Sequence, residues 1–288
     1  MRNLKVATIQ MSSTWESDQN IAKADRLVRE AASQGAQIIL LPEFFSTPYF
    51  YQVEDPNFFM LAKEIENSAP VNHFKKVAKE LQVVLPISFF ERKNNARYNS
   101  VAVIDADGEI LGVYRKSHIP DGPGYEEKFY LNPGNTGFKV WNTRYAKIGV
   151  GICWDQWFPE AARCMVLQGA EILLYPSAIG SEPTDPEMDS KDIWQLCMRG
   201  HAVANIIPVV ASNHVGVETI KDMGVDFYGS SFISNHRGVV ISEGDRTSES
   251  VSVAEFDLDQ IDMDRADWGI FRDRRPDLYK TLLTLDGQ

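Results

Sequence analysis

Cysteine is scarce in this sequence of 288 residues, with only Cys153, Cys164 and Cys197. Their number is odd and no two form a Cys-x-x-Cys pair, so no disulfide framework is expected. Long apolar runs are also missing: none approaches the roughly 18 residues of a membrane span, and the N-terminus lacks a stretch typical of a signal peptide. We therefore expect a protein of the reducing cytoplasm, with no membrane contact.

Basic residues are outnumbered, with 29 lysines and arginines against 40 aspartates and glutamates, and the formal net charge is −11. This balance argues against binding to nucleic acid or to an anionic membrane surface. It is compatible with a cationic substrate, which net charge alone does not identify. The five histidines show neither an HExxH motif nor a short paired spacing, so we expect no metal and no cofactor.

Strand-like and helix-like segments alternate along the chain, which is typical of a layered α/β architecture. Asp107-Gly108 marks a hairpin, and a loop rich in glycine, proline and charge follows it. No segment resembles an interdomain linker, so we expect a single domain over residues 1–288 with a C-terminal arm from about residue 266. The predicted strands are 5–9, 37–41, 83–89, 99–104, 109–114, 145–152, 171–175, 207–212, 232–234, 239–241 and 250–256, and the predicted helices are 18–33, 57–81, 159–168 and 190–205.

Cys153 stands where a predicted strand ends and the chain turns toward a helix. A strand, a sharp turn and a helix can present a nucleophile on an exposed elbow. A nearby helix N-terminus would also favour the thiolate. Taken alone, a cysteine in an apolar setting is more often a small core residue, and this is our interpretation of Cys164 and Cys197.

Glu43 and Lys116 also follow predicted strands directly. A carboxylate beside an apolar run can have a raised pKa and act as a general base, whereas most single glutamates and lysines are solvated surface charges. Three strand ends that carry Glu, Lys and Cys indicate one shared edge of the sheets, where ligand sites of α/β proteins collect.

Three segments resemble, in chain order, the signature regions of the nitrilase superfamily: residues 40–45 (LLPEFF), 114–120 (YRKSHIP) and 151–155 (GICWD). The resemblance covers essentially the whole chain and implies a four-layer α-β-β-α sandwich that assembles as a homo-oligomer, a dimer or larger. It implies that Glu43 is the general base, Lys116 stabilises the oxyanion and Cys153 is the nucleophile. Glu127 matches a second glutamate of the family, which positions the substrate and the attacking groups.

A narrower resemblance, carried by residues 121–130, 153–163 and 177–183, is to the branch of the superfamily that hydrolyses N-carbamoylputrescine. It implies a small carbamoyl amine as substrate and release of ammonia, carbon dioxide and putrescine. An alkylammonium tail requires carboxylates, so Asp121 and Glu182 are candidate binding residues. The backbone N–H of Trp154 is a candidate second donor to the oxyanion.

Alternatives from the same and from other classes remain open at this point. A carbamoyl amino acid hydrolase would need an arginine for the substrate carboxylate, and Arg163 and Arg199 are available. A binding protein on an inactive hydrolase fold would be expected to lack Glu43, Lys116 or Cys153, and all three are present. An enzyme that forms a Schiff base on Lys116 would leave the cysteine and the second glutamate unexplained.

Overall fold

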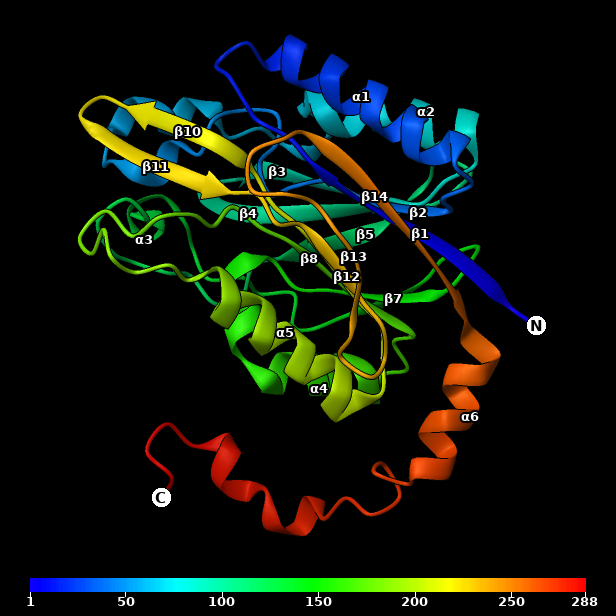
Figure 1. Ribbon diagram of the computed structural model, residues 1–288. Helices are drawn as coiled ribbons and strands as arrows, with labels where there is room; N and C mark the ends of the chain where they lie inside the picture. Colours follow the sequence, from blue (N-terminus) through cyan, green and yellow to red (C-terminus); the bar gives the residue numbers. More distant parts are fainter.

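Two β-sheets pack face to face in the computed structural model, which describes residues 1–288, and a pair of helices covers each outer face (Figure 1). This is the expected α-β-β-α sandwich. Leu4 and Val6 of the first strand belong to the core between the sheets, whereas Ala7 and Ile9 pack toward the first helix pair. Because side chains alternate between the two faces of a strand, this one strand packs against the other sheet on one face and against the helices on the other.

The first sheet consists of two three-stranded parts joined by a bridge between Ile38 and Val84. Helices α1 (Ser17–Ser33) and α2 (Ala69–Leu81) cover its outer face. The strand order is β14 (Ser250–Asp257), β1 (Asn3–Gln10), β2 (Ile38–Leu40) and then β3 (Leu85–Lys93), β4 (Ala96–Ile104), β5 (Ile110–Arg115).

The second sheet has six strands, of which the central β7, β8 and β9 are parallel. Helices α4 (Pro159–Leu167) and α5 (Lys191–Asn205) cover it. A separate hairpin of β10 (Val215–Ile220) and β11 (Met223–Tyr228) projects at one end (Figure 1). The order in the sheet is β13 (Val240–Glu243), β12 (Phe232–Ser234), β9 (Val209–Ser212), β8 (Ile172–Pro176), β7 (Lys147–Val150) and β6 (Val140–Asn142).

The predicted continuous helix over residues 57–81 is wrong. Two short 3-10 turns, Pro56–Leu61 and Ile65–Asn67, precede α2, which starts only at Ala69. Ser68 is extended (φ −77°, ψ 112°) and Pro70 lies in the first turn of α2, where its missing N–H costs no intrahelical hydrogen bond. Proline at this position therefore starts a helix rather than continuing one.

The sequence analysis also missed the β10–β11 hairpin, while the hairpin at Asp107-Gly108 is confirmed. Gly108 has φ +85°, and a Cβ there would lie 2.6 Å from the carbonyl oxygen of Lys75. Glycine is therefore required at this turn both for its backbone conformation and for its small size.

The C-terminal segment leaves the sandwich after α6 (Leu258–Trp268). Residues 269–288 contain only two short 3-10 turns, Pro276–Leu278 and Lys280–Leu283, and most of their side chains are exposed. Figure 1 shows this arm running past the side of the molecule that carries α4. None of the helices combines the length and the apolar character that crossing a bilayer demands.

Candidate active site

Three charged or nucleophilic side chains follow strands that end at the same edge of the molecule. Glu43 follows β2, Lys116 follows β5, and Cys153 follows β7 of the other sheet. The ammonium Nζ of Lys116 lies 3.0 Å from Oε1 of Glu43, and both side chains are fully buried. The thiol of Cys153 is 6 % exposed and lies within electrostatic range of both. The expected meeting of the three strand ends is thus confirmed.

Glu127, on the single-turn helix α3 (Glu127–Tyr130), holds Lys116 from the opposite side. Its two carboxylate oxygens accept hydrogen bonds from Nζ at 2.8 and 2.7 Å, and the hydroxyl of Tyr49 donates to one of them at 2.6 Å. Burial raises the pKa of Glu127 to about 7, although the ammonium opposes this rise. Burial alone would lower the pKa of Lys116, but the charges of Glu127 and Glu43 raise it, so Lys116 stays an ammonium.

Cys153 forms the corner between β7 and a 3-10 turn, Cys153–Trp157. Its backbone φ is +40°, in the left-handed region that a residue with a Cβ adopts only under strain, as expected for a nucleophile on an elbow. The thiol Sγ lies 3.8 Å from the carbonyl oxygen of Ala178.

The expectation that a helix N-terminus favours the Cys153 thiolate is wrong. Burial, and then the charge of Glu43, raise the pKa of the Cys153 thiol well above its ordinary value, although Lys116 opposes them. Only a short 3-10 turn begins at Cys153, and helix α4 begins later, at Pro159. With its pKa raised, Cys153 rests as a thiol, and an attack by it on a substrate would require a base to take its proton.

Glu43 presents one bonded and one free carboxylate oxygen. Its Oε1 accepts from Lys116 and from the side-chain amide of Asn99, whereas Oε2 is buried with no hydrogen-bond partner. The neighbouring N–H of Phe44 donates to Ser88 Oγ at 3.0 Å, which fixes the main chain here. A buried free carboxylate oxygen is an acceptor for a proton from the thiol or from a bound substrate.

Asp155 ties the segment around Lys116 to the elbow of Cys153. Its buried carboxylate accepts from the Tyr114 hydroxyl at 2.7 Å, from the Ile152 N–H at 2.9 Å, and from the N–H and Nδ1 of His118. The imidazole of His118 also stacks on the ring of Phe158, with centroids 3.6 Å apart. His118 therefore orients the elbow and packs against it.

Aromatic side chains pack around the buried charges. Tyr49 is one of these aromatic residues, and its hydroxyl donates a hydrogen bond to the carboxylate of Glu127. The aromatic cluster therefore contacts the charged side chains directly. In so apolar a setting the attraction between Lys116 and its carboxylates is strong. The cluster includes Phe44, Tyr49, Phe50, Tyr51, Phe90, Tyr130 and Phe227.

Two loops that carry the predicted substrate-binding acids pack against each other beside the buried centre. A Cβ on Gly124 (φ +83°) would lie 2.6 Å from Cγ of Pro183, so the loops touch closely here. The Tyr125 hydroxyl donates to the Ser181 carbonyl at 3.1 Å and accepts from the Gly180 N–H at 3.2 Å. Tyr125 also lies within electrostatic range of Glu182 and Cys153, so it connects the loops to the nucleophile.

Asp121, Glu126 and Glu182 on these loops, with Glu54 from the segment after the 3-10 turn Phe50–Gln52, form no salt bridge with any cation of the chain. We call these four acids the acidic rim. Glu182 is half-buried and its pKa is raised by burial and then by Asp185, whereas Asp121 is exposed. Burial and then the charges of Asp121 and Glu54 raise the pKa of Glu126. The rim therefore offers unpaired negative charge.

The other predicted residues lie in different settings. Trp154 stands beside the nucleophile, and its side chain is 39 % exposed. Arg163 donates to the Ala204 carbonyl and Arg199 to the Gly238 carbonyl, so both serve the outer α4–α5 layer rather than the buried centre. Cys164 is exposed on α4, so its interpretation as a core residue is wrong, and Cys197 is partly buried.

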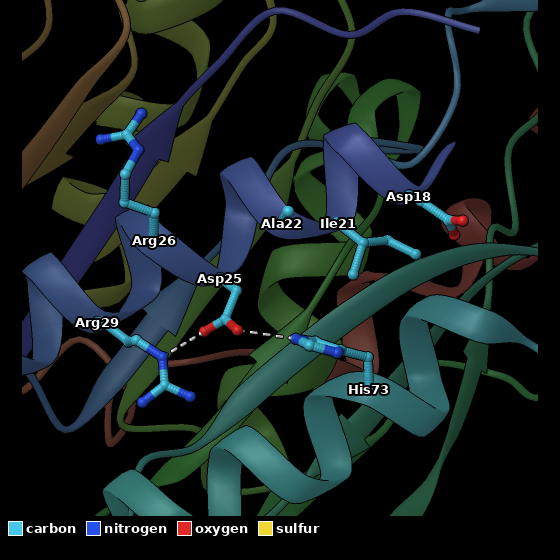
Figure 2. A pocket seen from close by; sticks show the side chains of 7 residues that line it. All are labelled: Asp18, Ile21, Ala22, Asp25, Arg26, Arg29 and His73. Carbon is cyan, nitrogen blue, oxygen red and sulfur yellow. Dashed lines mark hydrogen bonds and ion pairs between the residues drawn. The ribbon is translucent and has the colours of Figure 1, made fainter. Parts of the chain in front are cut away.

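A hollow of about 510 Å³ lies elsewhere, on the outer face between α1 and α2 (Figure 2). In it the Asp25 carboxylate lies 2.7 Å from Nε of Arg29 and 3.0 Å from Nε2 of His73. These charges satisfy one another, and none belongs to the buried centre. Across the structure, no group of three or more His, Cys, Asp or Glu side chains is arranged to hold a metal ion.

Sequence reasoning missed several residues that build the site: Tyr49, Asn99, Tyr125, Asp155, His214 and Glu218. Most of them are separated from their hydrogen-bond partners by many residues, as His214 is from Glu43. No motif of closely spaced residues therefore identifies them in the sequence. Asp155 had a local signal, since it follows Cys153 within the recognised motif.

The buried Cys, Glu and Lys on strand ends of a four-layer sandwich define a hydrolase of carbon–nitrogen bonds as the class. The family model described as carbon-nitrogen hydrolase matches residues 5–266, and the chain belongs to that family. This confirms the resemblance to the nitrilase superfamily.

Similar proteins cover the whole chain. It is 58 % identical to an N-carbamoylputrescine amidase of Arabidopsis thaliana, over 99 % of this chain and 97 % of the relative. It is 54 % identical to a citrullinase of Francisella tularensis, over 98 % and 99 %. A carbon-nitrogen hydrolase crystal structure from Helicobacter pylori G27 has a TM-score of 0.93 at 38 % identity, covering 99 % of both chains.

Proposed function

We propose that this protein hydrolyses N-carbamoylputrescine to putrescine, carbon dioxide and ammonia, with Cys153 as the nucleophile. The observation that carries the proposal is the combination of the buried Cys153, Glu43 and Lys116 with a neighbouring acidic rim that no cation of the chain neutralises. The buried centre supports cleavage of a carbon–nitrogen bond, and the rim supports a substrate with a positive tail. The similarity to N-carbamoylputrescine amidases agrees with both.

In the first half-reaction, the free oxygen of Glu43 takes the thiol proton as Cys153 attacks the ureido carbon. The ammonium of Lys116 and the backbone N–H of Trp154 stabilise the developing oxyanion. Glu43 then gives its proton to the departing nitrogen, and ammonia leaves. The product is a thiocarbamate on Cys153 that carries the aminobutyl chain.

In the second half-reaction, water replaces the thiol. Glu43 takes a proton from this water, which attacks the thiocarbamate carbon and returns the thiol to Cys153. The released carbamic acid loses carbon dioxide and gives putrescine. Glu127 keeps Lys116 in place through both steps, because it accepts two hydrogen bonds from Nζ.

Citrulline is the second candidate substrate, because the chain is 54 % identical to a citrullinase. Citrulline has the same ureido group, but its tail carries a carboxylate as well as an ammonium. That carboxylate needs a cationic partner, and Arg163 and Arg199 are bonded to main-chain carbonyls of the outer layer. The acidic rim therefore favours N-carbamoylputrescine.

The direct test is ammonia release from N-carbamoylputrescine, L-citrulline, N-carbamoyl-β-alanine and a simple nitrile under the same conditions. We expect the highest kcat/KM for N-carbamoylputrescine, because only this substrate has a cationic tail without a carboxylate. A higher kcat/KM for citrulline would identify the second candidate as the function. Preference for N-carbamoyl-β-alanine would contradict the role of the acidic rim.

We propose further that residues 1–288 form one domain that assembles as a homodimer. Exposed apolar side chains on α5 and next to β13 support this: Ile193, Leu196, Val203, Val239 and Ile241. The C-terminal arm beside the same layer adds the exposed Leu282 and Leu283. A second copy of the chain would bury the apolar side chains of both the layer and the arm. Light scattering should give a dimer for the wild type and for Met60→Asp, an exposed residue outside this layer, and a monomer for Leu196→Asp.

We also place the protein in the cytoplasm. The three cysteines are free, and Cys164 is exposed, which suits a compartment that keeps thiols reduced. Fractionation of cells that produce the protein tests this placement.

A further inference from the structure

A buried histidine lies directly behind Glu43. His214, between β9 and β10, is fully buried, and its Nε2 contacts the main-chain carbonyl oxygen of Glu43. Its Nδ1 lies 3.2 Å from Oε1 of Glu218, on β10. The ring of Phe227, on β11, packs beside the imidazole with centroids 5.3 Å apart. The imidazole of His214 is thus held by a polar contact at each ring nitrogen and by packing against Phe227.

Both ring nitrogens of His214 face groups that accept hydrogen bonds. A carbonyl oxygen has no proton to donate, so Nε2 must carry one. The other oxygen of Glu218 accepts the N–H of Tyr49 at 2.6 Å, and an ionised carboxylate has acceptors only, so against an ionised Glu218 Nδ1 must also donate. With Glu218 ionised, an imidazolium with a proton on each nitrogen satisfies both contacts, whereas a neutral His214 would require the proton to lie on Glu218.

The charges around the ring agree with this geometry. Burial opposes a charged imidazole, but the hydrogen bond and charge of Glu218, together with Glu43, raise the pKa of His214. The groups facing it are Glu218 from β10 and Glu43 from the segment after β2, whereas β11 contributes the uncharged Phe227. No second cation competes for Glu218.

We propose that His214 is a positioning residue, held as an imidazolium by Glu218, which fixes the main chain of Glu43 at the catalytic centre. A closed chain of contacts follows: His214 to Glu218, Glu218 to the Tyr49 N–H, the Tyr49 hydroxyl to Glu127, Glu127 to Lys116, and Lys116 to Glu43. The pair therefore sets the spacing of the two carboxylates that hold Lys116.

The protonation state has a test that needs no substrate. NMR of the ring nitrogens in nitrogen-labelled protein at pH 7 should show two protonated nitrogens in the signals lost in His214→Gln. The variant His73→Gln is the matched control, since His73 is also paired with a carboxylate but is only partly buried and lies outside the site. One unprotonated nitrogen at His214 would overturn the proposal.

The positioning role has a kinetic test, which rests on the proposed function. His214→Gln keeps one donor but no charge, so we expect kcat on N-carbamoylputrescine to fall ~10- to 100-fold, with KM changing much less, because a misplaced base slows the chemical step. Glu218→Gln should lower kcat similarly and shift the alkaline fall of kcat to lower pH, since His214 then loses its charge more easily. His73→Gln should behave as wild type.

A wild-type kcat and pH profile in both site variants would overturn the positioning role. If the variants fold but are too unstable for kinetics, thermal melting gives a second test. Because the pKa of His214 is raised in the folded protein, the stability it contributes is complete below its ordinary pKa and is lost as the pH rises through the folded value. The Tm gap between wild type and Glu218→Gln should therefore narrow as the pH rises, and a constant gap would contradict the proposal. If wild type does not hydrolyse N-carbamoylputrescine at all, the proposed function fails while the NMR result stands.

Discussion

The catalytic centre and the acidic rim contain similar carboxylates in opposite settings. Glu43 and Glu127 are at most 1 % exposed, and both are bonded to the ammonium of Lys116. Asp121 is exposed, Glu182 is half-buried, and neither is paired with a cation. Paired buried charges have fixed positions, which bond-making requires, whereas unpaired charges at the surface are free to attract a ligand. The buried centre suits the chemistry in the proposed function, and the exposed rim suits the choice of substrate.

Removing the nucleophile should have the largest effect. Cys153→Ala should abolish turnover and leave the fold intact, because only one sulfur atom is lost from a small side chain. Ammonia release and thermal melting measure the two properties. Cys164→Ala and Cys197→Ala are the controls and should keep full activity. A working Cys153→Ala enzyme would move the nucleophile elsewhere.

Removing the ammonium of the centre should come next. Lys116→Met keeps the length of the side chain but deletes a donor to the oxyanion, which should lower kcat ~10²–10³-fold. The loss should be larger if the two carboxylates, no longer held by Nζ, repel each other. Steady-state kinetics on folded protein measure it, and near-normal turnover would show that Lys116 is only structural.

The charge of Glu127 should appear in the pH profile. Its pKa of about 7 means that acid protonates this carboxyl and removes an acceptor from Lys116. Activity should therefore fall by about tenfold for each pH unit below that pKa. Glu127→Gln should show lower activity without this acid limb. An unchanged acid limb in the variant would assign the limb to another group.

Changing the rim should have the smallest effect on rate and the clearest effect on selectivity. Glu182→Gln should lower kcat/KM for N-carbamoylputrescine by roughly tenfold, less than a buried pair would lose, since water reaches this half-buried carboxylate. The neutral analogue N-carbamoylbutylamine should lose little. Glu187→Gln, an exposed acid of the same loop, is the control. An unchanged ratio of the two substrates in Glu182→Gln would remove this residue from the site.

The same contrast explains how much of the site could be predicted from sequence. Glu43, Lys116 and Cys153 each lie within three residues of the end of a strand, so a local pattern locates them and the topology brings the ends together. Tyr49 and His214 carry no such mark, because their partners lie far away in the chain and only the folded sheets join them.

Predictions from local sequence patterns were wrong where the tertiary structure opposes the local preference. The helical periodicity of residues 57–81 was sound as a pattern, but the chain is extended at Ser68 and Pro70 opens a new helix, so the segment divides. The Cys153 thiolate was expected from a nearby helix, whereas burial beside Glu43 decides its pKa. Burial is a property of the whole fold and cannot be read from neighbours in the chain.

The central claim is that Cys153 carries the substrate's ureido carbon during turnover. Wild-type protein quenched with acid while it hydrolyses N-carbamoylputrescine should be digested, and its peptides should be analysed by mass spectrometry. We expect an aminobutyl thiocarbamate on the peptide that contains Cys153, and unmodified Cys164 and Cys197. Turnover by the wild type with no adduct on Cys153 at any quench time, or an adduct on another residue, would contradict the account.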